Sequence, residues 1–437
     1  MKKNLVLAAL AVVGIMSATS CGGAKDTSYS GVNTEITIWA TAKEEPVVKK
    51  IVDAYNAKQK DDAAKFKYKF VAVAESDAGT TLAKDPMVDG APALVLCADD
   101  HVFNLVSKKS VIEIKGSYKE NILANNSEVS VKGASYNGKL YGYPVTSDNG
   151  YFLYYNSDEV TAEQAKSFET LLKVAKEKGK QVFFTLNDGW YANSFLMSPQ
   201  ANGLSSLSWS ANAEGKVSYT TDWDNETGVK VSEYIGNLIK TYYDDGTLQV
   251  GDDAAKVAAA QEGKAIAIVS GTWMESNLTA DTAWGAAKTK ATKLPEYHIE
   301  DKAYQMASFT GSKIYTINST RPVAEQKAAA ALADLLTNKE SQLIRFEQRQ
   351  TIPCNKEALN DDRYTKNVTI SANALALQNN FAAVQAQAAQ DRYWDVGKAI
   401  GQAYMDGKFD DADNTTIKSW SEFLKTQMDI LRKSSII

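Results

Sequence analysis

Residues 35–55 read EITIWATAKEEPVVKKIVDAY and combine two periodicities. Polar and apolar side chains alternate from Glu35 to Trp39, which is typical of a β-strand. Pro46 suits the first turn of a helix, and the apolar residues after it recur at helical spacing: Val48, Ile51, Val52 and Tyr55. The segment therefore predicts a strand followed at once by an amphipathic helix.

Two further strands are predicted downstream of this helix. Residues 66–73 alternate again, and the continuous apolar run 93–97 is typical of a strand buried on both faces. Strands that alternate with helices predict a parallel α/β sheet with right-handed crossovers. Because ligands bind beyond the carboxyl ends of such strands, residues 39–45 and 97–101 are expected near a cleft.

A second block repeats this pattern. Strands are predicted at 152–155, 182–186 and 265–269, with helices at 168–178 and 227–243 between them. The fold class is therefore α/β. At about 150 residues per domain, the 437 residues allow two or three domains.

The composition narrows the possible functions. The chain has a formal net charge of −5, only 2 His and 3 Cys, but 8 Trp, 21 Tyr and 13 Phe. Zinc enzymes and His-based triads are nearly excluded, because imidazole and thiolate are their usual ligands and bases, so we expect neither a metal nor a cofactor. No long Lys/Arg block indicates a nucleic-acid partner.

The N-terminus predicts export. Two lysines precede the apolar run Leu5–Met16, which is too short to span about 30 Å of hydrocarbon, so residues 1–20 are predicted to be a signal peptide. Cys21 follows small residues, as in a bacterial lipobox, and is the expected lipidation site; a plain secretory signal with a chance cysteine is the alternative. Residues 21–33 are rich in Gly, Ser and Thr and predict a lipid-anchored flexible tether. The expected location is extracytoplasmic, at the outer face of the cell membrane or in a periplasm.

Five phrases of the sequence occur together in order. They are Gly138–Pro144 with Leu153–Asn156, Glu262–Trp273, Phe309–Gly311, a helix over Asn318–Leu336, and Ile352–Lys356. With these phrases the chain resembles the family 1 extracellular solute-binding proteins of ABC importers, roughly over residues 34–435. The resemblance implies a protein that captures a solute, passes it to the transmembrane permease subunits and catalyses no reaction. It also implies a monomer.

The same resemblance implies a two-lobe, type II periplasmic-binding-protein fold. Each lobe is expected to be a mostly parallel sheet flanked by helices, with a hinge between the lobes. The N-terminal lobe is expected to comprise residues 34–147 and 309–353. The C-terminal lobe is expected to comprise 148–308 and 354–437.

Within the family the chain looks most like the maltose/maltodextrin-binding branch. Phe184–Tyr191 is similar to a segment that supplies an acid and a stacking aromatic to the sugar, which fall on Asp188 and Trp190. Trp273 falls on a second sugar-facing Trp, and Tyr393–Trp394 on an aromatic pair whose first member usually stacks. The remaining matches are a polar turn at Asp100 and His101, a charged contact at Lys43, and a further acid at Asp148 or Asn149.

These residue types suit sugar chemistry. Aromatic rings cover the apolar faces of a sugar, while carboxylates and amides bind its hydroxyl groups. The candidate ligand-binding set is Trp39, Lys43, Asp100, Asp188, Trp190, Tyr191, Trp273, Tyr393 and Trp394. Each aromatic has the alternative of a core position, and each acid that of a helix cap or turn residue.

Other interpretations stay open at this point. Another oligosaccharide is an alternative ligand, because aromatic platforms serve many sugars. A secreted glycoside hydrolase needs two carboxylates about 5–9.5 Å apart in a cleft, and no motif singles out such a pair. A surface adhesion protein is a third class. Cys97 and Cys354 could pair outside the cytoplasm, although no sequence feature shows that they meet.

Overall fold

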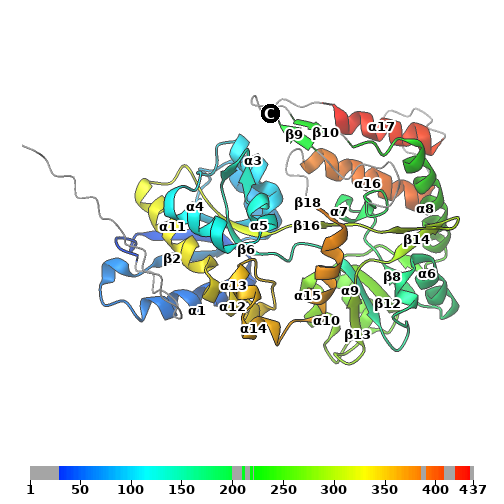
Figure 1. The fold of residues 1–437 in the computed structure, drawn as a ribbon, viewed down its shortest axis with the longest axis horizontal. Coiled ribbons are helices and arrows are strands. Elements are labelled where there is room, and N and C mark those ends of the chain that lie inside the picture. Colours follow the sequence, from blue (N-terminus) through cyan, green and yellow to red (C-terminus); the bar gives the residue numbers. More distant parts are fainter. Residues whose placement is uncertain are drawn as a thin grey trace, which may run out of the picture.

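The computed structural model shows a chain folded into two lobes (Figure 1). Within the part of the chain that it describes, no helix has the length and apolar character needed to cross a membrane. Cys21, the predicted signal peptide and most of the predicted tether lie outside the described residues. The described residues are 29–198, 209–211, 217–219, 221–384, 390–407 and 419–433.

The first lobe is built on a five-stranded sheet in the order β2-β1-β3-β17-β6. Its strands are β1 (Glu35–Ala40), β2 (Lys67–Ala72), β3 (Leu94–Ala98), β6 (Tyr143–Thr146) and β17 (Lys313–Ile317). The predicted strands at 35–39, 66–73 and 93–97 are therefore confirmed. The flanking helices are α1 (Glu45–Asn56), α2 (Glu75–Lys84), α3 (Val102–Ser107), α4 (Gly116–Asn125), α5 (Glu128–Gly133), α11 (Val323–Thr337) and α12 (Lys339–Arg349).

The second lobe has a sheet of the same size in the order β11-β8-β12-β7-β13. Its strands are β7 (Phe152–Asn156), β8 (Gln181–Phe183), β11 (Leu248–Gln249), β12 (Ala265–Ser270) and β13 (Thr289–Thr292). Its helices are α6 (Phe168–Glu177), α7 (Gly189–Ala192), α8 (Glu226–Asp244), α9 (Asp253–Gln261), α10 (Glu275–Leu278), α15 (Ile370–Gln378), α16 (Gln390–Asp406) and α17 (Trp420–Arg432).

The prediction of mostly parallel sheets is confirmed in strand direction, since four of the five strands in each sheet run the same way and one is reversed. β1 pairs in parallel with β2 and β3, but β17 runs antiparallel to β3 and β6. In the second lobe β8 pairs in parallel with β11 and β12, and β7 is antiparallel to β12 and β13. The one reversed strand of each sheet, β17 in the first lobe and β7 in the second, directly follows a point where the chain changes lobe, so it enters its sheet from the hinge.

Three segments carry the chain between the lobes (Figure 1). The first follows β6, where the Ser147 amide donates to the carbonyl of Ile352 at 2.9 Å. The second follows β16 (Ser308–Thr310), which pairs in parallel with β18 (Ala382–Val384). The third lies later than the predicted position at 354, because α13 (Lys356–Leu359) and α14 (Asp362–Thr365) pack on α12 of the first lobe. The chain enters the second lobe at α15, which packs on β13 and β7.

Part of the predicted tether packs on the first lobe. Tyr29 is buried, its ring lies 5.4 Å from that of Phe66, and its hydroxyl donates to Asp334 Oδ2 at 2.6 Å. Cys97 and Cys354 are both buried and both free. The structure therefore contains no disulfide between these two residues.

Candidate functional site

A cavity of about 910 Å³ lies between the two lobes. This size is typical of a small-molecule site, for which about 300–1,000 Å³ is usual. The first lobe contributes η1 (Ala42–Glu44), the start of α1, and the end of α12; the second contributes η5 (Thr272–Met274) and α10. The lining side chains are Lys43, Pro46, Val47, Asp148, Thr272, Trp273, Glu275, Ser276, Thr279, Ala280, Lys313, Glu347, Gln348, Arg349, Gln350 and Thr351.

Trp273 is placed in this cavity by the end of β12. The strand stops at Ser270, and the indole of Trp273 folds back over Gly271: a Cβ at Gly271 would lie only 2.0 Å from the ring. The indole Nε1 donates to Asp253 Oδ2 at 2.8 Å, and the side chain remains partly exposed. Gly271 is thus required because the ring occupies the space that any other side chain would fill.

Trp190 lies beside Trp273 although it comes from another element. Asp188 caps α7 by accepting the Trp190 amide at 2.8 Å, and Gly189 packs so closely on Trp394 of α16 that a Cβ would lie 2.1 Å from its carbonyl oxygen. The ring centroids of Trp190 and Trp273 are 6.0 Å apart, with an interplanar angle of 34°. Trp190 does not itself line the cavity, but it extends the aromatic surface that begins with Trp273.

Polar groups reach the cavity from the first lobe and the crossing segment. Lys43, for which the sequence predicted a charged contact, is exposed and lines the cavity. Asp148 is 2% exposed, and its Oδ1 has no hydrogen-bond partner among the described residues. Burial by itself lowers the pKa of Lys313. The carboxylates of Glu75, at 3.3 Å, and Asp148 raise the pKa by more than burial lowers it. The pKa therefore lies above its ordinary value, and the amine is charged.

The sequence identified only part of this polar set. Asp148 was one of two alternatives and was left out of the candidate set, and Lys313 was missed. Both lie where the chain changes lobe, and this is the signal that could have found them. Arg349 was also missed; it lines the cavity and bonds Glu44, which also accepts from Arg345 Nε at 3.0 Å.

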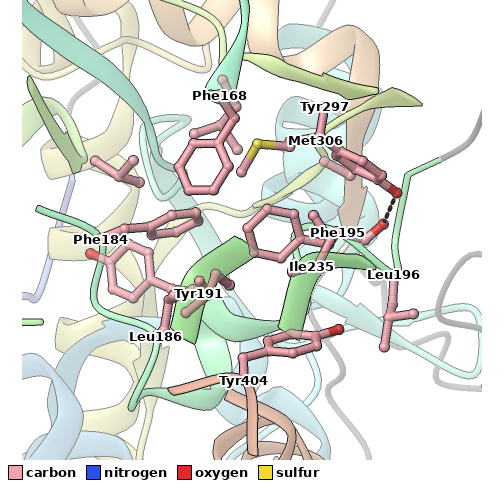
Figure 2. Close-up of a cluster of buried hydrophobic side chains, with 14 of the residues drawn as sticks. Phe168, Phe184, Leu186, Tyr191, Phe195, Leu196, Ile235, Tyr297, Met306 and Tyr404 are labelled. Carbon is pink, nitrogen blue, oxygen red and sulfur yellow. Dashed lines mark hydrogen bonds between the residues drawn. The ribbon is translucent and has the colours of Figure 1, made fainter. Parts of the chain in front are cut away.

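Three predicted aromatic contacts are core residues in the structure. Trp39 is 8% exposed and belongs to the core of the first lobe. Tyr393 is 0% exposed. Its hydroxyl accepts a hydrogen bond from Asn193 Nδ2 at 3.2 Å, and its ring packs against that of Phe309. Tyr191 points into the core cluster beside Phe184 (Figure 2).

The helix geometry explains these corrections. Neighbouring residues on a helix project about 100° apart, so two adjacent aromatics rarely face the same cleft. In each adjacent pair one ring is buried and the other partly exposed: Tyr191 is buried beside Trp190, and Tyr393 beside Trp394. Trp394 therefore takes the more accessible position that the sequence assigned to Tyr393.

The two predicted acids occupy different environments. Asp188 is exposed at the start of α7 and acts as its N-cap, so the cap alternative is present in the structure. Asp100 follows β3, is 9% exposed, and has an Oδ1 without a hydrogen-bond partner within the described residues. It lies outside the residues that line the cavity. Among the described residues, no group of three or more His, Cys, Asp or Glu side chains is placed to hold a metal ion.

The chain thus forms two mixed α/β lobes with a cavity between them, and small-molecule sites often lie at such an interface. The profile of the bacterial extracellular solute-binding proteins matches residues 50–372. The chain therefore belongs to this family. No curated protein sequence matches it significantly.

Several solved structures share this fold. A structure with acarbose is 24% identical, with a TM-score of 0.75 over 92% of this chain and 99% of that chain. The maltodextrin-binding protein MalE1 from L. casei BL23, without ligand, is 21% identical, with a TM-score of 0.72 over 92% and 99%. The maltose-binding periplasmic protein MalE from Listeria monocytogenes, in complex with maltose, is 19% identical, with a TM-score of 0.68 over 91% and 97%.

Proposed function

We propose that this protein captures an oligosaccharide of the maltodextrin type between its two lobes. The observation that carries the proposal is the pair of indoles, Trp190 and Trp273, at the edge of a cavity lined by polar groups from both lobes. A sugar ring presents an apolar face and a rim of hydroxyl groups. Aromatic rings suit the face, and charged or amide groups suit the rim.

The polar lining is suited to a neutral ligand. Lys43, Lys313 and Arg349 are balanced by Asp148, Glu275 and Glu347. Carboxylates accept hydrogen bonds from hydroxyl groups, and ammonium or guanidinium groups donate to them. The related proteins solved with maltose or acarbose support a sugar of this class.

Capture between lobes implies closure about the crossing segments. A ligand shifts the balance between an open and a closed form only through contacts that it makes in the closed form. Residues of the cavity come from η1 and α12 on one side and η5 and α10 on the other, so one ligand can contact both. The closed form then delivers its sugar to the transmembrane subunits of an ABC permease.

The chain is further proposed to be anchored through a lipidated Cys21 after removal of residues 1–20. The small residues before Cys21 support this proposal, and the described residues of the first lobe start at Tyr29, eight positions after Cys21. Mass spectrometry of the mature protein tests it: a lipid mass on Cys21 is expected, and an unmodified Cys21 would overturn it.

Calorimetry with a panel of maltooligosaccharides, acarbose and unrelated glycans tests the ligand. We expect saturable binding of α-glucans that weakens about thirtyfold or more in Trp273→Ala, because truncating a central aromatic costs about 2 kcal/mol or more. The loss should be smaller in Trp190→Ala, because Trp190 lies beside the cavity lining and not in it. Tyr243→Ala is the matched control, since Tyr243 lies on α8, which contributes nothing to the cavity lining. Unchanged affinity in both tryptophan variants would refute the site.

The same panel also tests for hydrolysis. Chromatography of maltooligosaccharides incubated with the protein should recover them intact. Shorter products would overturn the binding-protein proposal in favour of a glycoside hydrolase.

A further inference from the structure

A buried lysine lies behind the pair of indoles. Lys256 is on α9, and its side chain is only 2% exposed. Its Nζ lies 3.4 Å from Asp253 Oδ1 and 5.2 Å from the centroid of the Tyr191 ring. Burial lowers the pKa of Lys256, and Asp253 offsets this only in part. A buried ammonium group with one long ion pair contributes little to stability, and an apolar residue of the same length would fill the space as well.

The ion pair connects directly to Trp273. Asp253 holds Lys256 with Oδ1, and its Oδ2 accepts the hydrogen bond from the indole Nε1 of Trp273 at 2.8 Å. The Asp253 side chain is 48% exposed, and these two interactions restrain the orientation of its carboxylate and of the indole that donates to it.

The contacts close into a ring of five side chains. From Lys256 they pass to Tyr191, whose ring lies 4.9 Å from that of Trp190 at an angle of 80°. Trp190 in turn lies 6.0 Å from Trp273, which returns through its hydrogen bond to Asp253. Three separate elements, α7, α9 and η5, are thus linked at the point where the aromatic surface forms.

We propose that the Asp253–Lys256 pair is a positioning device that sets the orientation of both indoles toward the ligand. The proposal rests on the function above, in which these indoles stack on a sugar. Lys256 itself contacts no ligand; it orients Asp253 on one side and supports Tyr191 beneath Trp190 on the other. A surface that is already oriented loses less side-chain freedom on binding, so its affinity is higher.

The test compares Lys256→Met, which keeps the aliphatic stem without the charge, with Asp253→Ala, which removes both interactions. Calorimetry with the best-bound glycan should show affinity about fivefold to tenfold weaker in Lys256→Met and at least as weak in Asp253→Ala. The melting temperature of Lys256→Met should be unchanged or raised, because the variant no longer buries an ammonium group and the charge left behind, on Asp253, is 48% exposed and stays hydrated. Lys240→Met is the matched control: it breaks an exposed pair with Asp244 in the same lobe and should bind normally.

A second measurement does not depend on the sugar. The near-ultraviolet circular dichroism of the ligand-free protein contains a contribution from the coupled indoles, identified as the signal lost in Trp190→Phe. Lys256→Met should lose most of this signal. If the wild-type protein binds no glycan, the proposed function fails, while this signal still decides the positioning role. Wild-type affinity together with a wild-type circular dichroism signal in Lys256→Met would overturn the inference, whether or not the melting temperature falls.

Discussion

Gly271→Ala perturbs the proposed ligand surface without replacing any side chain of the site. The added Cβ would lie 2.0 Å from the Trp273 ring, so the ring must move by about 1.4 Å to reach an ordinary contact of 3.4 Å. The backbone at Gly271, with φ −99° and ψ −171°, is extended and accepts an alanine without strain. The substitution therefore acts on the position of one indole alone.

The expected magnitudes separate binding from stability. Displacing the ring lengthens its 2.8 Å hydrogen bond to Asp253, at a cost of about 1 kcal/mol. Replacing glycine at an extended position returns about 0.4–1 kcal/mol through the unfolded chain, so the free energy of unfolding should change little. Ligand affinity should fall by roughly fivefold to thirtyfold, because a displaced Trp273 loses part of the 2 kcal/mol or more that its truncation would remove, about 1–2 kcal/mol.

Calorimetry measures the affinity, and urea unfolding measures the stability of the same preparation. A double-mutant cycle provides the control. In a Trp273→Ala background, Gly271→Ala should have no further effect on binding, since the ring that it displaces is gone. Wild-type affinity in Gly271→Ala, or equal losses with and without Trp273, would refute the reasoning.

Three further predictions concern the rest of the fold. Gly401→Ala should lower the free energy of unfolding by about 1–3 kcal/mol, because its Cβ would lie 1.7 Å from the carbonyl oxygen of Leu186, and urea unfolding measures this. Cys97 and Cys354 should not react with Ellman's reagent at pH 8 in the native protein and should both react in denaturant, since burial raises the pKa of both thiols, that of Cys354 to about 12. Burial raises the pKa of Asp334 above 3.8, so the folded state binds this proton more tightly than the unfolded state does. The resulting stabilisation is lost as the pH rises through the folded pKa. Asp334→Asn should therefore reduce the loss of stability that the wild-type protein shows between about pH 4 and 7.

Each of these has its control. Lys398→Ala, at an exposed position on α16, should leave stability unchanged, and an equal loss there would contradict the packing argument. The thiol assay uses the Cys21→Ser form, and absence of reaction in denaturant would show a disulfide after all. The wild-type profile is the reference for the third prediction, and an unchanged profile in Asp334→Asn would contradict the assignment.

Most of the strands and helices were predictable, because the spacing of apolar residues along the chain indicates which side of each element is buried. The continuous apolar run at 93–97 became β3, the strand between β1 and β17, and the helix expected after Pro46 became α1. The strand directions at the hinge were not predictable, since the pattern of apolar and polar residues in a strand is the same whether it pairs in parallel or antiparallel. The packing of α13 and α14 on the first lobe was missed because no local pattern shows which lobe a short helix joins. In the structure the ring centroid of Tyr364 lies 4.9 Å from that of Phe346 on α12.

The candidate site divides in the same way. The sequence by itself determined that aromatic residues follow strand ends, and it singled out Trp190 and Trp273. Only the tertiary structure decided that these two rings meet, that Tyr191 and Tyr393 turn into the core, and that Asp253 holds Trp273. The physical reason is that alternation and helical period encode which side of one element is buried, whereas contact between side chains far apart in the chain depends on how whole elements pack.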